Sequence, residues 1–123
     1  MKVLFVSNDP TIFDAASHAR ARMRAYAEAI GELHIISSAN KDAREEQDEN
    51  LFLHPVHAWK IFRISALAKR ARELILAYGI EVVSAQDPFE HGLAALRAIS
   101  KTQYPKPKLH IQVHTDFLSP WFV

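Results

Sequence analysis

The stretch that decides the fold is Ile80-Glu-Val-Val-Ser-Ala-Gln-Asp-Pro-Phe-Glu-His-Gly-Leu-Ala-Ala-Leu-Arg-Ala-Ile-Ser100, because its hydrophobic period changes partway. The β-branched run at its start, from Ile80 to Val83, predicts a buried strand. After Asp87 the apolar residues recur at helical spacing and predict a helix with one buried stripe. The members of that stripe are Phe89, Leu93, Leu96 and Ile99. A strand that leads directly into a helix is typical of an α/β fold.

The junction between this strand and this helix is a candidate ligand site. Asp87 can accept hydrogen bonds from the first-turn amides, Pro88 suits the first helical position, and Glu90 completes a capping box. Residues that follow a parallel strand lie at the carboxyl edge of the sheet, where ligands bind in open α/β folds. Gln86, Asp87 and His91 are therefore candidate binding residues. The same sequence also suits a plain strand-to-helix turn.

Strand and helix patterns alternate through the rest of the chain. Strands are predicted at 2–7, 32–38, 51–53 and 109–114, and helices at 14–30 and 58–78. The glycines Gly31 and Gly79 are expected to end the two helices, and His54-Pro55 to end the third strand. This alternation predicts a Rossmann-like three-layer α/β/α sandwich with a parallel sheet, formed by residues 1–123 as a single domain.

Two segments of the chain have a strong charge bias. Residues 39–50 carry five acidic side chains and almost no apolar ones, which predicts an exposed acidic loop or a frayed helical turn. The helix at 58–78 is expected to bury one face, Ile61 included, and its other face is basic. That basic face suits solvent, and it also suits the anionic surface of a membrane. In the helix at 14–30, Tyr26 is expected to point inward.

The composition excludes several classes of protein. The formal net charge is +1, which favours neither a nucleic acid nor an acidic partner. The chain has no cysteine, so it has no disulfide and no thiolate nucleophile, as is usual in the cytoplasm. The N-terminal apolar run is too short for a signal peptide. We expect a cytoplasmic protein, with peripheral contact at the inner face of the membrane as an open alternative.

Three polar clusters follow strands that are expected to end at the same edge of the sheet. Their members are Asn8 and Asp9, then Gln86 and Asp87, then His114, Thr115 and Asp116. A histidine at the end of a strand can contact a ligand or donate a proton to a sugar hydroxyl or phosphate, and it can equally bond to a loop carbonyl. His110 and His114 lie ~13 Å apart along a strand, so we expect no metal site.

Common nucleotide and hydrolase motifs are missing from the sequence. The first strand is not followed by Gly-x-Gly-x-x-Gly, and there is no Gly-x-x-x-x-Gly-Lys-Ser/Thr. There is no Gly-x-Ser-x-Gly elbow either. The absence of these motifs argues against a dinucleotide-binding dehydrogenase, a P-loop nucleotidase and an α/β hydrolase.

Two segments together resemble a known family. Val82-Val-Ser-Ala-Gln-Asp-Pro-Phe-Glu-His-Gly-Leu-Ala-Ala-Leu96 and Leu109-His-Ile-Gln-Val-His-Thr-Asp-Phe-Leu-Ser-Pro-Trp-Phe122 are similar to the fourth-strand and fifth-strand segments of family 4 glycosyltransferases of GT-B fold. They match the N-terminal domain of that family, and the resemblance covers nearly the whole chain except the acidic loop. Such enzymes have two Rossmann-like domains that face each other across a cleft.

The resemblance implies a retaining transfer of a sugar from a nucleotide-diphosphate sugar to a sugar or lipid-linked acceptor, without a metal or other cofactor. The first domain mainly holds the acceptor and the second holds most of the donor. By this resemblance His114 approaches the donor sugar near the reacting carbon. The turn at Gln86 and Asp87 and the first loop, with Asn8 and Asp9, line the acceptor side of the cleft.

The chain departs from the family pattern at two places. Many members carry a Gly-Gly pair after the first strand, where this chain reads Asp9-Pro-Thr-Ile-Phe-Asp-Ala-Ala-Ser17, so close contact to the donor diphosphate is not expected there. The second domain is missing, so we expect a fragment that is inactive alone. The alternative is a stand-alone Rossmann-like module that binds a nucleotide or another anion without catalysis. The apolar end at 117–122 is also expected to promote self-association.

Overall fold

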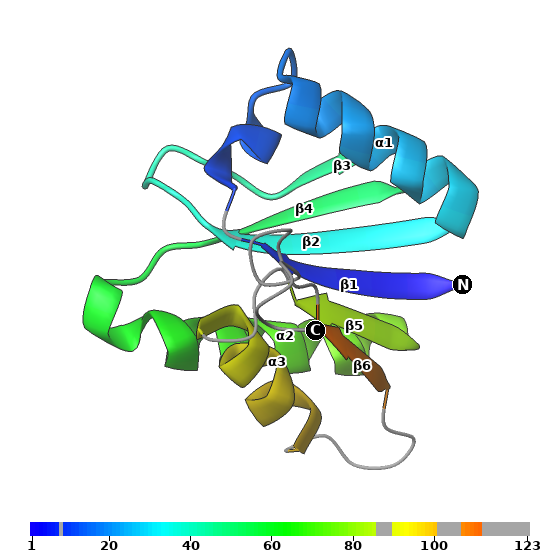
Figure 1. Cartoon of the computed structure of the whole chain (residues 1–123). Helices are drawn as coiled ribbons and strands as arrows, with labels where there is room; N and C mark the ends of the chain where they lie inside the picture. The colour runs from blue at the N-terminus through cyan, green and yellow to red at the C-terminus, as the bar shows by residue number, and fades with distance from the viewer. Residues whose placement is uncertain (8, 86–89, 101–106, 112–123) are drawn as a thin grey trace, which may run out of the picture.

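The computed structural model describes residues 1–7, 9–85, 90–100 and 107–111 and arranges them in three layers. A six-stranded sheet forms the middle layer (Figure 1). Helix α1 (His18–Ile30) covers one face, and helices α2 (Arg63–Tyr78) and α3 (Glu90–Ser100) cover the other. The α/β sandwich predicted from the sequence is confirmed.

The order of the strands places a reversal at the centre of the sheet. From edge to edge the order is β3 (Glu46–Asp48), β4 (Leu51–Val56), β2 (Glu32–Ser38), β1 (Lys2–Ser7), β5 (Val82–Ala85) and β6 (Lys108–Ile111). All neighbours pair in parallel except β3 and β4. The chain winds outward through β2 and β4 on one side of β1, and through β5 and β6 on the other. Ligands of open α/β sheets bind at the carboxyl ends of the strands at such a reversal.

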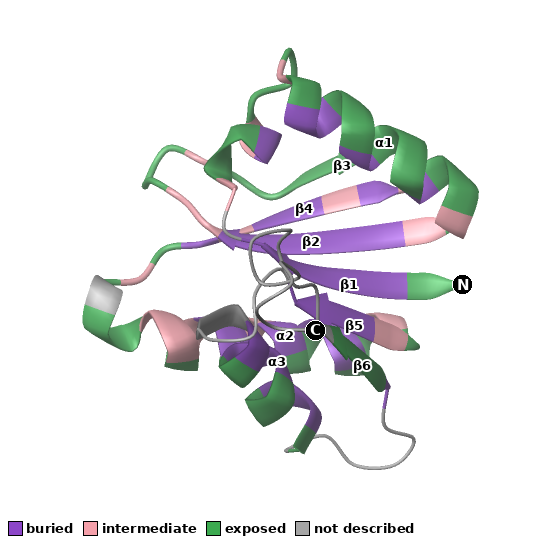
Figure 2. Ribbon diagram, in the orientation of Figure 1, coloured by how far each residue is buried: buried purple, intermediate pink, exposed green. Residues whose placement is uncertain are grey.

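Strand β1 forms the centre of the core because its continuous apolar run is covered on both faces (Figure 2). Leu4 and Val6 belong to the cluster that packs beneath α2 and α3. Val3 and Phe5 belong to the cluster beneath α1. Each such apolar side chain contributes about 1.5–3 kcal/mol when it is buried, so these four residues hold both helical layers to the sheet.

Helix α1 begins later than the pattern indicates. A short 3₁₀ helix, η1 (Pro10–Phe13), comes first, and Ser17 then caps α1 by accepting a 3.0 Å hydrogen bond from the amide of Arg20. Gly31 ends the helix as predicted, with φ 114° and its N–H bonded to Ala27. The prediction that Tyr26 points inward is wrong, because it is 45% exposed beside the buried stripe and only its ring edge meets Phe5.

Helix α2 is preceded by a 3₁₀ turn, η2 (Lys60–Phe62), so the predicted helical start at residue 58 is too early. The prediction that Ile61 is buried is wrong: it lies in that turn and is 82% exposed. The rest of the predicted face is confirmed, and its buried members are Leu67, Ala68, Ala71, Leu74 and Ile75. Gly79 ends the helix in the left-handed conformation, with φ 68°.

Helix α3 packs through alanines, and the predicted leucine stripe is wrong. Leu93 and Leu96 are 39% and 52% exposed, whereas Ala94, Ala95 and Ala98 are fully buried or nearly so. Small side chains let the helix backbone approach α2 and the sheet closely, so the leucines are displaced to the outer side. Ile99 is buried as predicted, and Phe89 lies outside the described residues.

The acidic segment contributes a strand, and the strand after it is longer than predicted. Residues 39–50 are mostly exposed, but Glu46–Asp48 form β3, so the prediction of a loop is wrong for these three residues. Strand β4 does not end at His54-Pro55 but continues to Val56, pairing with β2 along its whole length. Because β3 pairs only with residues 51–53, Pro55 lies beyond that pairing, at the outer edge where proline is tolerated.

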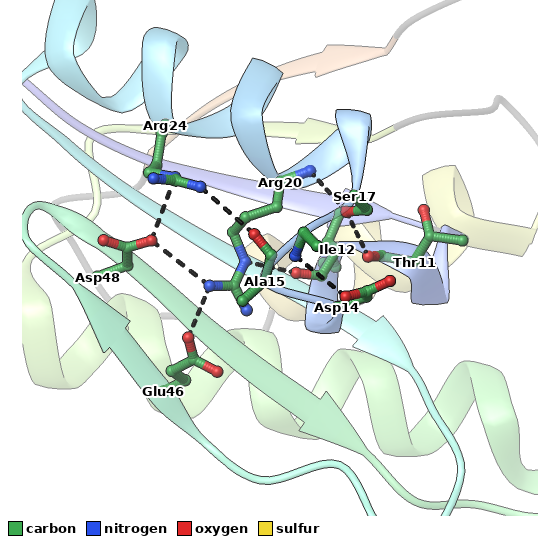
Figure 3. A network of polar contacts seen from close by, with 10 residues as sticks. Thr11, Ile12, Asp14, Ala15, Ser17, Arg20, Arg24, Glu46 and Asp48 are labelled. Atoms are coloured by element: carbon green, nitrogen blue, oxygen red, sulfur yellow. Dashed lines mark hydrogen bonds and ion pairs between the residues drawn. The ribbon is translucent and has the colours of Figure 1, made fainter.

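The first loop is held in place by the guanidinium of Arg20 (Figure 3). This side chain is only 1% exposed, and its Nε donates a 2.6 Å hydrogen bond to the carbonyl of Ile12 in η1. Its Nη1 pairs with Glu46 at 2.6 Å and with Asp48 at 3.4 Å, both in β3. Arg24, one turn on, pairs with Asp48 at 3.3 Å. Arg20 is therefore a buried residue that joins η1, α1 and β3.

We predict that Arg20→Met destabilises the protein by about 3 kcal/mol, because a buried ion pair loses one partner. Arg24→Met is the matched control and should cost at most about 1 kcal/mol, since Arg24 is half exposed in its pair with Asp48. Urea unfolding followed by circular dichroism measures both. Equal losses of unfolding free energy in the two variants would contradict the prediction, because they would show that the burial of Arg20 does not strengthen its ion pairs.

Candidate functional site

A cavity of about 240 Å³ opens between α1 and the sheet, at the carboxyl end of β1. The strands contribute Phe5, Ser7 and Ile35, the first loop contributes Asp9 and Ile12, and α1 contributes Ala19, Arg22, Met23 and Tyr26. Its base is apolar, and its polar groups come from the end of β1, from the first loop and from α1. The cavity therefore lies beside the reversal of the strand order, where a ligand site is expected in this architecture.

Asp9 is the predicted site residue that the structure places at this cavity. Its amide donates a 3.1 Å hydrogen bond to Ser7 Oγ, which fixes the loop to the end of β1. Its Oδ1 accepts hydrogen bonds from the amide and the hydroxyl of Thr11, which caps η1. Among the described residues no donor contacts Oδ2. The carboxylate is thus held rigidly by one oxygen while the other remains available to a ligand.

Most of the other predicted site residues lie outside the described residues. These are Asn8, Gln86, Asp87, His114, Thr115 and Asp116, together with the apolar segment 117–122. His91 lies in the first turn of α3, but its side chain is not described. The ends of β1 and β5 are neighbours, since Val6 pairs with Ala85. The carboxyl ends of these two strands therefore lie next to each other.

Arg22 and Tyr26 are cavity residues that the sequence does not single out as a pair. They are four residues apart on the exposed side of α1, and Tyr26 meets Phe5 edge to face with centroids 6.4 Å apart. Their spacing puts them on one helical stripe, but an outward-facing arginine and tyrosine are common on any helix. Only the packing of the helix against the sheet beside β1 reveals that they border a cavity.

A second polar group lies on the same face of the sheet, on the other side of Phe5. Ser84 pairs with Phe5 across β1 and β5, and its hydroxyl lies 3.0 Å from Nδ1 of His110 on β6. Ser84 is buried and His110 is exposed. Helix α1 packs over β2 and β4, away from these strands. Ser84 and His110 therefore extend the polar lining of this face towards β6.

The opposite face of the sheet contains a buried pair of histidines that the sequence does not predict. His34 and His54 are 0% and 4% exposed, and Nδ1 of His34 lies 3.1 Å from Nε2 of His54. The outer nitrogen of His34 contacts Glu32 at 2.8 Å, and that of His54 contacts Glu45 at 3.3 Å. Arg70 of α2 pairs with Glu45. Five side chains thus form one hydrogen-bonded chain.

Burial keeps this histidine pair neutral. It lowers the pKa of His54 from 6.5 to about 4, although the hydrogen bond to Glu45 acts in the opposite direction. Burial also lowers the pKa of His34, against the effect of Glu32. When neutral His34 donates to Glu32, its Nδ1 accepts from Nε2–H of His54. Nδ1 of neutral His54 then has no proton for Glu45, and it lies 3.5 Å from the Nη2 of Arg70, which can donate to it. The pair is a structural element of the core.

The remaining features of the described part of the chain bear on metals and membranes. Among residues 1–7, 9–85, 90–100 and 107–111, no group of histidine and acidic side chains has the arrangement of a metal site. Within the same ranges no helix is long and apolar enough to cross a membrane.

No protein-family model matches the chain, and a search of curated proteins finds no match.

We predict that the protein loses stability as the pH falls from 6.5 towards 4. In this window the histidines of the unfolded chain bind protons, whereas His54 in the folded protein does so only near pH 4. Between pH 7 and pH 5 the loss from His54 alone is about 2 kcal/mol. His54→Gln, which can still accept and donate hydrogen bonds, should show a smaller loss. Urea unfolding at the two pH values measures this, and identical losses would contradict it.

Proposed function

We propose that these 123 residues are the N-terminal, acceptor-side domain of a retaining glycosyltransferase of family 4 and GT-B fold. The observation that carries the proposal is the cavity at the carboxyl end of β1, beside the reversal between β1 and β5. The resemblance of 82–96 and 109–122 to the family's strand segments supports the same assignment.

The chemistry of the cavity suits a saccharide acceptor. The carboxylate of Asp9 and the hydroxyl of Ser7 can accept hydrogen bonds from sugar hydroxyls, and the guanidinium of Arg22 can donate to sugar oxygens. Tyr26 adds an aromatic face with a polar end. An apolar base with a few fixed polar groups is the usual composition of a small-molecule site.

In this proposal the donor approaches from a second Rossmann-like half that faces the same edge. His114 then contacts the donor sugar, and Asn8, Gln86, Asp87, His91, Thr115 and Asp116 complete the acceptor side. Three exposed apolar side chains support an opposing surface there: Trp59, Ile61 and Phe62 are 83%, 82% and 60% exposed just after β4 reaches that edge. The reaction needs no metal, and its nucleotide-sugar donor places the protein in the cytoplasm.

The second candidate is a stand-alone module that binds a nucleotide or another anion without catalysis. Arg22 favours it, because a guanidinium at the mouth of the cavity can bind a phosphate with two parallel hydrogen bonds. The two candidates differ in the ligand that the cavity accepts. A saccharide without phosphate fits the acceptor domain, and a free nucleotide fits the module.

We predict that titration with saccharides, followed by amide NMR shifts, moves signals of Ser7, Asp9, Arg22 and Tyr26. Asp9→Asn should weaken this binding about tenfold, because a neutral amide replaces a charged acceptor while the cap on Thr11 is kept. Asp14→Asn is the matched control: Asp14 also caps a turn, through the amide of Ala16, but does not line the cavity. It should leave the affinity unchanged.

Two results of this titration would count against an acceptor domain. If free nucleotides shift the amide signals of the cavity residues and no saccharide shifts them, the result would favour the binding module. A saccharide response that is equal in the wild type and Asp9→Asn would show that the cavity is not the acceptor site.

We also predict that these 123 residues alone transfer no sugar, because donor and acceptor react between two halves in the family that the chain resembles. Release of nucleoside diphosphate from a panel of nucleotide sugars measures the reaction, with an active two-domain glycosyltransferase as positive control. Turnover by the 123-residue chain above the background without protein would refute the two-half arrangement.

A further inference from the structure

A second cavity lies on the outer side of the helical layer, between α2 and α3, and its volume is about 230 Å³. It is lined by Ser65, Ala68, Lys69 and Arg72 of α2 and by Arg97 of α3. The four α2 residues recur at positions i, i+3, i+4 and i+7, which is one stripe of a helix. Ala68 is buried and too small to fill the gap, so the groove between the helices remains open at this point.

Three cations border this cavity without a carboxylate partner among the described residues. Three other arginines have carboxylate partners: Arg20 and Arg24 pair with the acidic residues of β3, and Arg70 pairs with Glu45 and Glu73. Glu73, the acidic residue next to Arg72 in the sequence, is thus already engaged. Like charges that converge from two helices repel one another, and an anion between them relieves that repulsion.

We propose that Lys69, Arg72 and Arg97 form a binding site for a phosphate group, separate from the cavity at the carboxyl edge. A phosphate monoester carries close to two negative charges at neutral pH and offers three strong acceptor oxygens. Two arginine forks and a lysine match those oxygens, and Ser65 adds a hydroxyl donor. The cavity is large enough for a phosphate group, because its volume of about 230 Å³ is several times the ~30 Å³ that one water molecule occupies in the liquid.

The surroundings of the site bear on the source of the phosphate. Leu76 lies one turn after Arg72 and Leu93 one turn before Arg97, and they are 60% and 39% exposed. Exposed leucines on the same two helices as a phosphate site suit the headgroup region of a membrane that contains phosphate lipids. A free phosphate compound has the same chemistry at the cations, and the experiment separates the two sources.

The first arm of the test is a titration of the 123-residue chain with inorganic phosphate at low ionic strength, followed by amide NMR shifts. We expect localised shifts at Ser65, Lys69, Arg72 and Arg97. Arg97→Gln should weaken binding about tenfold, because it removes a charge-assisted contact. Lys41→Gln is the matched control: it removes the same charge from the exposed acidic segment and should leave the affinity unchanged.

The second arm is sedimentation with phosphatidylcholine vesicles, with and without phosphatidic acid. Phosphatidic acid presents a phosphate monoester at the membrane surface. Binding that requires this lipid and is lost in Arg97→Gln supports a lipid-borne phosphate, even where free phosphate binds weakly. Shifts with free phosphate and no vesicle binding support a soluble phosphate compound.

Two outcomes would overturn the proposal. One is the lack of localised shifts with phosphate together with vesicle binding that Arg97→Gln does not change. The other is an equal loss in Arg97→Gln and Lys41→Gln, which would reduce the effect to net charge. Neither outcome bears on sugar binding at Asp9, so the test is independent of the proposed function.

Discussion

The buried guanidinium of Arg20 determines the shape of the first loop and of the edge of the sheet beside it. One arginine bonds the carbonyl of Ile12, pairs with two acids of β3 and belongs to α1. Because η1 carries part of the cavity wall, Arg20 helps to position the loop that holds Asp9, together with the hydrogen bond from Asp9 to Ser7. The same contacts allow part of the acidic segment, which has little apolar content, to form β3 at the edge of β4, because they neutralise the charges of Glu46 and Asp48.

The fold could be predicted because it depends on features that are local in the sequence. The apolar run of β1, the switch from strand to helix near residue 86, and the glycines Gly31 and Gly79 fix the order and limits of most elements. The errors arose where tertiary contacts outweigh local pattern. Leu93 and Leu96 match a helical stripe, yet the smaller Ala94 and Ala98 pack better in a narrow gap.

The candidate site could be predicted only in part, because its residues come together through topology. Asp9 follows β1, and any α/β pattern places it at the carboxyl edge. Arg22 and Tyr26 become cavity residues only once α1 is packed against the sheet beside β1. The buried pairing of His34 and His54 also escaped prediction, since a polar residue in a strand is expected to face solvent, and their mutual hydrogen bond exists only in the assembled sheet.

The pairing of β1 with β5 has a consequence for synthesis on the ribosome. One edge of β1 can pair with β2 once about forty residues have emerged, but Val3 and Leu4 meet their partners Val82 and Val83 only when twice that length is available. Until then this apolar central strand has an open edge, which favours association with other nascent chains. Slow translation before Val82 would prolong this interval, and binding of a chaperone to the first strand would protect the chain through it.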